Sequence, residues 1–159
     1  MVWTDPVDAT ASVTAVTAAR EKTYVLDNLR AIAEWTTYSP TVIQSGTVTK
    51  TDTYCKYKSY GGTVEVIARL TITGSGTGNN AITVSLPVTA AASDLYVGGG
   101  RITDTGTANY PVLVEITSTT VASFLRSDAP TPLGYVGVDP NFALANTDII
   151  RFWCRYEAA

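Results

Sequence analysis

The stretch from residue 63 to residue 73, "TVEVIARLTIT", constrains the fold more than any other part of the chain. Its side chains alternate between apolar and polar, and every second one from Val64 to Ile72 is apolar. Alternation with a period of two predicts a β-strand that buries one face and exposes the other. Ile67 is the exception, because it is an apolar side chain on the expected outer face.

Strand signals recur after residue 35, where no second helical pattern is found. Turn-forming sequences such as Gly61-Gly62 and "GSGTGNN" separate them, and the triple glycine at 98–100 permits a bend or a close backbone approach. The 26 threonines suit half-buried strand surfaces. We therefore expect an all-β fold, an antiparallel jelly-roll-like sandwich of about eight strands. The expected strands are 41–50 with a bulge at Gly46, 53–60, 63–73, 82–86, 95–103, 110–117, 119–126 and 149–156.

The first 16 residues are expected to form an extended docking arm. Pro6 fixes its own φ and biases the preceding residue away from a helix. Trp3, Pro6 and Val7 are the candidate partner-binding residues, since apolar side chains in such an arm have little local core to join.

Residues 17–35 are expected to form one amphipathic helix before a β domain at 36–159. Val25, Leu29 and Ile32 recur at helical spacing and make an apolar stripe. The stripe must be buried, so it would pack on the domain or against copies of itself.

Charge argues against a nucleic-acid partner. The chain has 11 Lys and Arg against 14 Asp and Glu, a net charge of −3, whereas phosphate backbones are bound through clustered cations. In "YCKYKSYGGTVEV" the lysines at 56 and 58 would share a strand face with Tyr54 and Tyr60. Such a face can stack on single-stranded nucleic acid, but a solvated strand face is the preferred interpretation.

The amino terminus carries no signal-peptide pattern, and no apolar stretch approaches the ~18 residues that span a bilayer. We expect synthesis in the cytoplasm and no membrane insertion. Cys55 and Cys154 could pair only on neighbouring strands, and free, buried thiols are the expectation.

Catalysis is not expected. With zero histidines, Ser-His-Asp and Cys-His nucleophile systems cannot be built, and no cofactor motif is present. A carboxylate pair could act on a glycoside, but no convergent pair is visible among six candidate acids. Glu65 and Glu115 lie at outward positions of alternating strands, where a solvated charge is the preferred interpretation. The last loop carries oxygen ligands that could bind calcium, but ordinary turn chemistry is the preferred interpretation, so no metal is expected. The candidate acids are Glu65, Glu115, Asp104, Asp128, Asp139 and Asp148, and the candidate calcium ligands are Asp139, Asn141, Asn146 and Asp148.

An exposed aromatic is expected in the last strand. Trp153 alternates with Phe152 and Cys154, so one of the two rings faces away from the core. An outward aromatic is either a subunit contact or a ligand contact, and subunit contact is the commoner use.

Five segments occur in an order that resembles a group of tailed-phage virion proteins. They are "YVLDNLRAIAEW", "TTYSPTV", "KYKSYGGTVEVIARLTI", "VSLP" and "TDIIRFWCRYEAA", and they span roughly residues 24–159. The resemblance implies a jelly-roll domain, related in shape to trimeric modules, on the virion surface as a head decoration or minor tail protein. It implies no catalysis.

The resemblance implies a trimeric decoration protein that docks on the major capsid protein and stabilises the head shell. Long tail proteins usually carry this domain at the end of a larger chain, whereas here an arm and one helix precede it. The alternative is a tail protein that binds a host surface glycan through Tyr96, Tyr110 and Tyr135.

Overall fold

The computed structural model describes residues 34–128 and 133–159. The predicted arm, with Trp3, Pro6 and Val7, lies outside the described residues, as do Val25, Leu29 and Ile32 of the predicted helix. Only Glu34 and Trp35 of that helix are described, and neither is helical.

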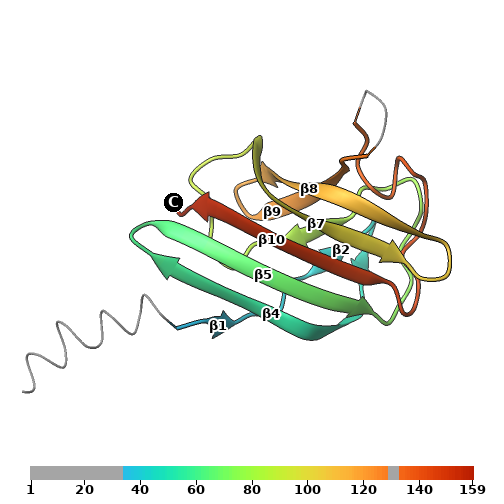
Figure 1. The fold of residues 1–159 in the computed structure, drawn as a ribbon, viewed down its shortest axis with the longest axis horizontal. Helices are drawn as coiled ribbons and strands as arrows, with labels where there is room; N and C mark the ends of the chain where they lie inside the picture. Colours follow the sequence, from blue (N-terminus) through green and yellow to red (C-terminus); the bar gives the residue numbers. More distant parts are fainter. Residues whose placement is uncertain (1–33, 129–132) are drawn as a thin grey trace, which may run out of the picture. The chain divides into compact units, whose positions relative to one another are not determined.

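The described residues form ten β-strands in one sheet, and every pairing in it is antiparallel. The prediction of an all-β antiparallel fold is therefore confirmed. The order across the sheet is β1-β4-β5-β10-β7-β8-β9-β6-β2-β3, and Figure 1 shows the long strands β4, β5, β10 and β7 side by side. The strands are β1 (Thr36–Thr37), β2 (Val42–Ile43), β3 (Thr47–Val48), β4 (Lys50–Tyr60), β5 (Thr63–Ile72), β6 (Thr83–Ser85), β7 (Leu95–Asp104), β8 (Ala108–Ser118), β9 (Val121–Arg126) and β10 (Ile149–Glu157).

The sheet curls back on itself. Strands β3 and β4 lie near opposite ends of the sheet order, yet Thr49 alone joins them along the chain. The carbonyl oxygen of Thr49 also accepts a hydrogen bond from the amide of Thr73, just after β5 (2.9 Å). Two distant ends of one sheet can be this close only if the sheet is strongly curved.

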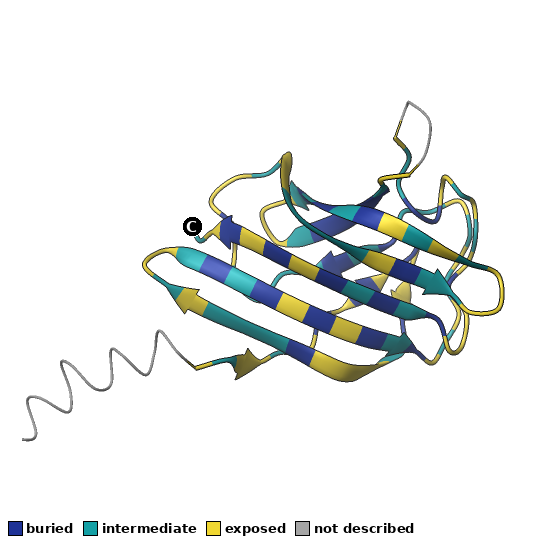
Figure 2. Ribbon diagram, viewed as in Figure 1, coloured by how far each residue is buried: buried dark blue, intermediate teal, exposed yellow. Residues whose placement is uncertain are grey.

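Curling brings the apolar faces of distant strands together in one core. The rings of Phe124 in β9 and Phe152 in β10 have centroids 5.4 Å apart, although β7 and β8 separate these strands within the sheet. Figure 2 shows the alternation of buried and exposed residues along β5 and β10. The prediction for 63–73 is confirmed, because Val64, Val66, Ala68, Leu70 and Ile72 are buried while Ile67 is 40% exposed.

The prediction of a single strand at 41–50 is wrong, because the short strands β2 and β3 form there instead. The chain reverses between β2 and β3, where Ser45 has a φ of 66° and the amide of Gln44 donates to the carbonyl of Gly46 (2.9 Å). Gln44 is buried, and its side chain bonds to backbone groups of Asn80, Phe142 and Leu144. These bonds attach the turn between β2 and β3 to loops that are far away in the sequence. A pattern within residues 41–50 cannot reveal such contacts.

The triple glycine at 98–100 marks a close approach of two strands, which is one of the two possibilities that the sequence allowed. A Cβ added to Gly98 would lie 2.7 Å from the Cα of Cys154, and one added to Gly100 would lie 2.8 Å from the Cα of Phe152. Backbone atoms cannot move away as a flexible side chain can. Glycine is therefore required at both positions for β7 to pair with β10 as it does.

We expect Gly100→Ala to lower the free energy of unfolding by about 1–3 kcal/mol, the usual cost of overpacking. Gly46→Ala is the matched control, because a Cβ there meets no atom within 4 Å. Urea denaturation monitored by circular dichroism measures both. Equal stability of the two variants would contradict the close approach.

Candidate functional site

The outer face of β4, β5, β10 and β7 concentrates the positive charge of the domain. Side chains on these strands that alternate with the buried ones point outward. Of the eight lysines and arginines in the described residues, only Lys50 and Arg126 are not on this face. The other six are Lys56, Lys58, Arg69, Arg101, Arg151 and Arg155. A chain with a net charge of −3 therefore carries a distinctly basic face.

Three of these cations form a row across adjacent strands, which we call the arginine row. Arg151 of β10 pairs in register with Arg69 of β5 on one side and with Arg101 of β7 on the other. Neighbouring strands lie about 4.8 Å apart, so the three side chains start close together. No acidic side chain within residues 34–128 or 133–159 forms an ion pair with any of them.

The arginine row is electrostatically unfavourable in the free protein. Burial, followed by the charges of Arg69 and Arg101, lowers the pKa of Arg151. Like charges directly opposite each other destabilise a sheet. An anion placed over the row would remove this repulsion.

Trp153 lies beside the arginine row, two residues further along β10. It pairs in register with Ile67 of β5 and with Gly99 of β7, and its side chain is 58% exposed. A Cβ on Gly99 would lie 3.9 Å from the indole Nε1, so the edge of the ring lies over Gly99, which has no side chain of its own. A shallow hollow of about 380 Å³ spans this region, lined by Ile67, Ala68, Arg69, Gly100, Arg101, Arg151, Phe152 and Trp153.

The two lysines of this face already have partners. The Nζ of Lys56 lies 5.1 Å from the centre of the Tyr54 ring. The Nζ of Lys58 lies 2.9 Å from a carboxylate oxygen of Glu65 and 5.1 Å from the centre of the Trp35 ring. Lysines thus lie over the rings of Tyr54 and Trp35. This arrangement favours the interpretation as a solvated strand face, because these rings are not free to stack on the bases of a nucleic acid.

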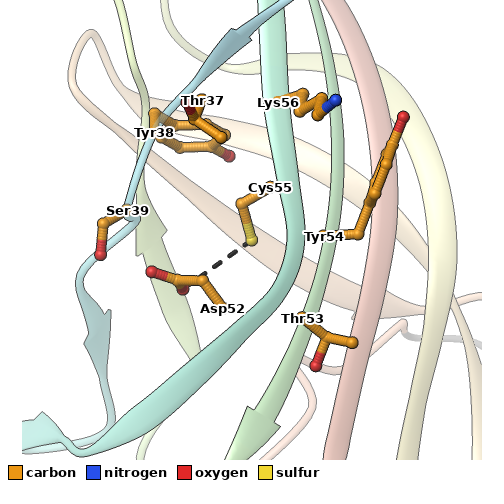
Figure 3. A pocket seen from close by; sticks show the side chains of 8 residues that line it. All are labelled: Thr37, Tyr38, Ser39, Asp52, Thr53, Tyr54, Cys55 and Lys56. Carbon is orange, nitrogen blue, oxygen red and sulfur yellow. Dashed lines mark hydrogen bonds between the residues drawn. The ribbon is translucent and has the colours of Figure 1, made fainter.

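A second hollow, of about 440 Å³, lies between β1 and β4, next to the bulge at Asp52 and Tyr54. Figure 3 shows Cys55 and Asp52 on the side of β4 that faces Tyr38, while Tyr54 points away on the other side. The Tyr38 hydroxyl is buried without a hydrogen-bond partner among the described residues, and burial raises its pKa. Burial opposes the Asp52 charge, but hydrogen bonds from Lys50 and Ser39 outweigh it and lower the Asp52 pKa.

Neither thiol is an activated nucleophile. Burial, together with the Asp52 charge, raises the pKa of Cys55 to about 11, and burial raises that of Cys154 to about 12. A reactive cysteine needs a lowered pKa, so both stay protonated at neutral pH. The expectation of free, buried thiols is confirmed, because β5 separates the strands of the two cysteines.

Three of the six candidate carboxylates are held by other side chains. Glu65 bonds to Lys58 and to the hydroxyl of Tyr60 (2.6 Å). Glu115 accepts from the hydroxyl of Tyr135 (2.6 Å), and Asp128 pairs with Arg126 (2.5 Å). These contacts give each of the three acids a local structural partner.

Asp148 joins two loops. Its Oδ1 accepts from the amide of Thr105 and its Oδ2 from the amide of Ala145, both at 2.8 Å. Burial and the nearby Asp148 raise the pKa of Asp104. In the proposed calcium set, Asn141 instead accepts from the amide of Asn79 (2.6 Å). Asp139 and Asn146 are exposed, and no group of three metal-binding side chains gathers in the described part of the chain.

The three tyrosines predicted to contact a glycan are not all together. Tyr96 is 62% exposed and pairs in register with Glu115, to which Tyr135 donates its hydroxyl hydrogen. Tyr110 lies five residues back along β8, where its ring stacks on Phe142 with centroids 5.3 Å apart. Five residues of a strand span about 17 Å, so a single sugar would not reach all three.

The arginine row is the feature that sequence reasoning missed. Its members come from three strands that are distant in the chain, and each looks like an ordinary polar position in an alternating pattern. Only the register of β5, β10 and β7 places them side by side.

No protein-family model, curated protein or solved structure matches this chain. Among the residues that the structure describes, none belongs to a helix with the length and apolar character needed to span a membrane. The function is therefore inferred from the residues and their geometry.

We expect both thiols to resist Ellman's reagent in the native protein at pH 8, because burial keeps them protonated and covered. They should react together in 6 M guanidinium chloride, and native reactivity should rise only as the pH approaches 11, the raised pKa of Cys55. Cys55→Ala and Cys154→Ala variants identify each thiol. Stoichiometric labelling of the native protein at pH 8 would show that the hollow activates Cys55.

We expect Asp148→Asn to destabilise the domain by about 1–3 kcal/mol, because the amide can accept only one of the two backbone hydrogen bonds. Asp139→Asn is the control, since that side chain is exposed. Thermal unfolding in buffer containing EDTA measures the stability of each variant, and the same scans with calcium in place of EDTA test for a metal site. If calcium raises the unfolding temperature of the wild type but not that of Asp148→Asn, the residue is a metal ligand instead.

Proposed function

We propose that this chain is a non-enzymatic structural protein of a tailed-phage virion. It forms a trimer, docks on the major capsid protein and stabilises the head shell. Added subunit contacts favour the assembled shell by mass action. The arm residues Trp3, Pro6 and Val7 make the docking contact in this proposal, and the β domain covers the shell surface.

The observation that carries the proposal is the ordered set of motifs, considered together with the strands they form. "KYKSYGGTVEVIARLTI" spans residues 56–72, which are the end of β4, the turn and all of β5, while "TDIIRFWCRYEAA" contains β10. "VSLP" begins in β6 and ends at Pro87. The motifs are thus parts of the framework of the fold rather than isolated surface patterns.

The finer assignment of the fold as a jelly roll belongs to the same proposal. Its support is the curled antiparallel sheet, in which β5 pairs with the last strand of the chain and not only with its hairpin partner. Long-range pairing of early and late strands is typical of Greek-key and jelly-roll folds.

A second candidate function is attachment to a host surface carbohydrate as a minor tail protein. The exposed Trp153 beside the arginine row favours it, because an aromatic ring next to charged hydrogen-bond donors suits a sugar. Tyr96 and Tyr135 would be a separate contact in this role.

Copy number per purified particle tests the proposal, measured by quantitative mass spectrometry against the major capsid protein. Hundreds of copies are expected for a head decoration protein. A few copies in multiples of three would favour the tail role. Absence from particles would show that the chain is not a virion protein.

A further inference from the structure

We propose that the outer face of β5, β10 and β7 binds a short acidic saccharide. The arginine row holds carboxylates of the ligand, and the ring of Trp153 packs against one sugar face. The inference deepens the second candidate function, attachment to carbohydrate, and rests on it only for its biological setting. Binding itself is a property of the isolated chain.

The arginine row argues for an anionic ligand. Guanidinium groups are planar, stay charged and hold a carboxylate by two parallel hydrogen bonds. Here three of them lie in one register row, and no acid in the described residues forms an ion pair with them. An unpaired row of like charges breaks the usual pattern of cross-strand pairing, and such exceptions are expected at functional sites.

Trp153 and its neighbours argue for a ligand with a flat apolar surface. Trp153 is 58% exposed, Ile67 beside it is 40% exposed, and Gly99 adds no side chain on the other flank. Two residues along a strand cover about 6.7 Å, which is the distance from the arginine row to Trp153. A ligand that reaches both needs a ring and a charged group close together, as in an acidic sugar.

A second copy of the same face is a poor occupant. Face-to-face contact would place the arginine row of one chain near that of another, and buried like charges without partners are costly. This repulsion favours the ligand interpretation of Trp153 over the subunit-contact interpretation.

Single-stranded nucleic acid fits less well than a saccharide. Proteins that bind it offer successive aromatic rings to successive bases. On this face Lys56 lies over Tyr54 and Lys58 lies over Trp35 and Tyr60, whereas no described cation lies over Trp153.

The test is an NMR titration of the full-length chain with a hyaluronan tetrasaccharide, which carries glucuronate, and with neutral maltotetraose. We expect the indole N–H of Trp153 and the amides of β10 to shift with hyaluronan only. Binding should weaken in 0.5 M NaCl, since the contacts are ionic. Arg151→Gln should weaken it at least about tenfold, consistent with loss of a charge-assisted hydrogen bond, and Trp153→Ala should also weaken it about tenfold.

Arg126→Gln is the matched control, because Arg126 lies in β9 and pairs with Asp128 outside this face. It should bind like the wild type. Arg151→Gln should unfold at the same temperature as the wild type or higher, because it removes like-charge repulsion, so its loss of binding would not reflect unfolding.

Several outcomes would overturn the proposal. One is that hyaluronan shifts no NMR signal of Trp153 or β10. The others are that maltotetraose binds as tightly as hyaluronan, or that Arg151→Gln binds hyaluronan as tightly as the wild type does. Tighter binding of an eight-residue oligothymidylate that depends on Trp153 would assign the face to nucleic acid instead. None of these results bears on copy number in particles, so the saccharide proposal and the virion proposal can fail separately.

Discussion

The register of β5, β10 and β7 is the constraint on which the rest of the structure depends. It places Ala68, Phe152 and Gly100 in one row toward the core, and Arg69, Arg151 and Arg101 in the next row toward the outside. A slip of one residue would exchange the two faces, burying arginines and exposing the core. The cost of that exchange makes the register unique, and the same register builds the outer face.

The glycines of β7 allow this register to form at close range. Gly98 and Gly100 lie where a Cβ would collide with the backbone of β10, and Gly99 lies on the opposite face beside Trp153. One tripeptide therefore serves both sides of the sheet. It permits tight pairing toward the core and leaves the indole open on the outside, which links the stability of the fold to the shape of the candidate site.

The distribution of charge matters more here than its sum. A net charge of −3 suggests a chain that repels anions, but the fold gathers six of the eight described cations on one face. The lysines there are occupied by Glu65 and by aromatic rings, whereas no described acid pairs with the arginine row. An anion-binding face can therefore exist on an acidic protein. The proposed saccharide site uses this face, whereas the proposed capsid contact is made by the arm.

The sequence alone determined the fold class and most of the strands. The alternation in 63–73 and 149–156 reflects burial of one strand face, which is a local property that a local pattern can report. It also placed Ile67 on the outer face and predicted free, buried thiols, while the triple glycine left a bend or a close approach open. Tertiary structure decided the rest. The reversal at Ser45 depends on bonds from Gln44 to residues far along the chain, and the arginine row depends on pairing between strands that are distant in sequence. Long-range register is set by the packing of the whole core, so no pattern within one segment can contain it.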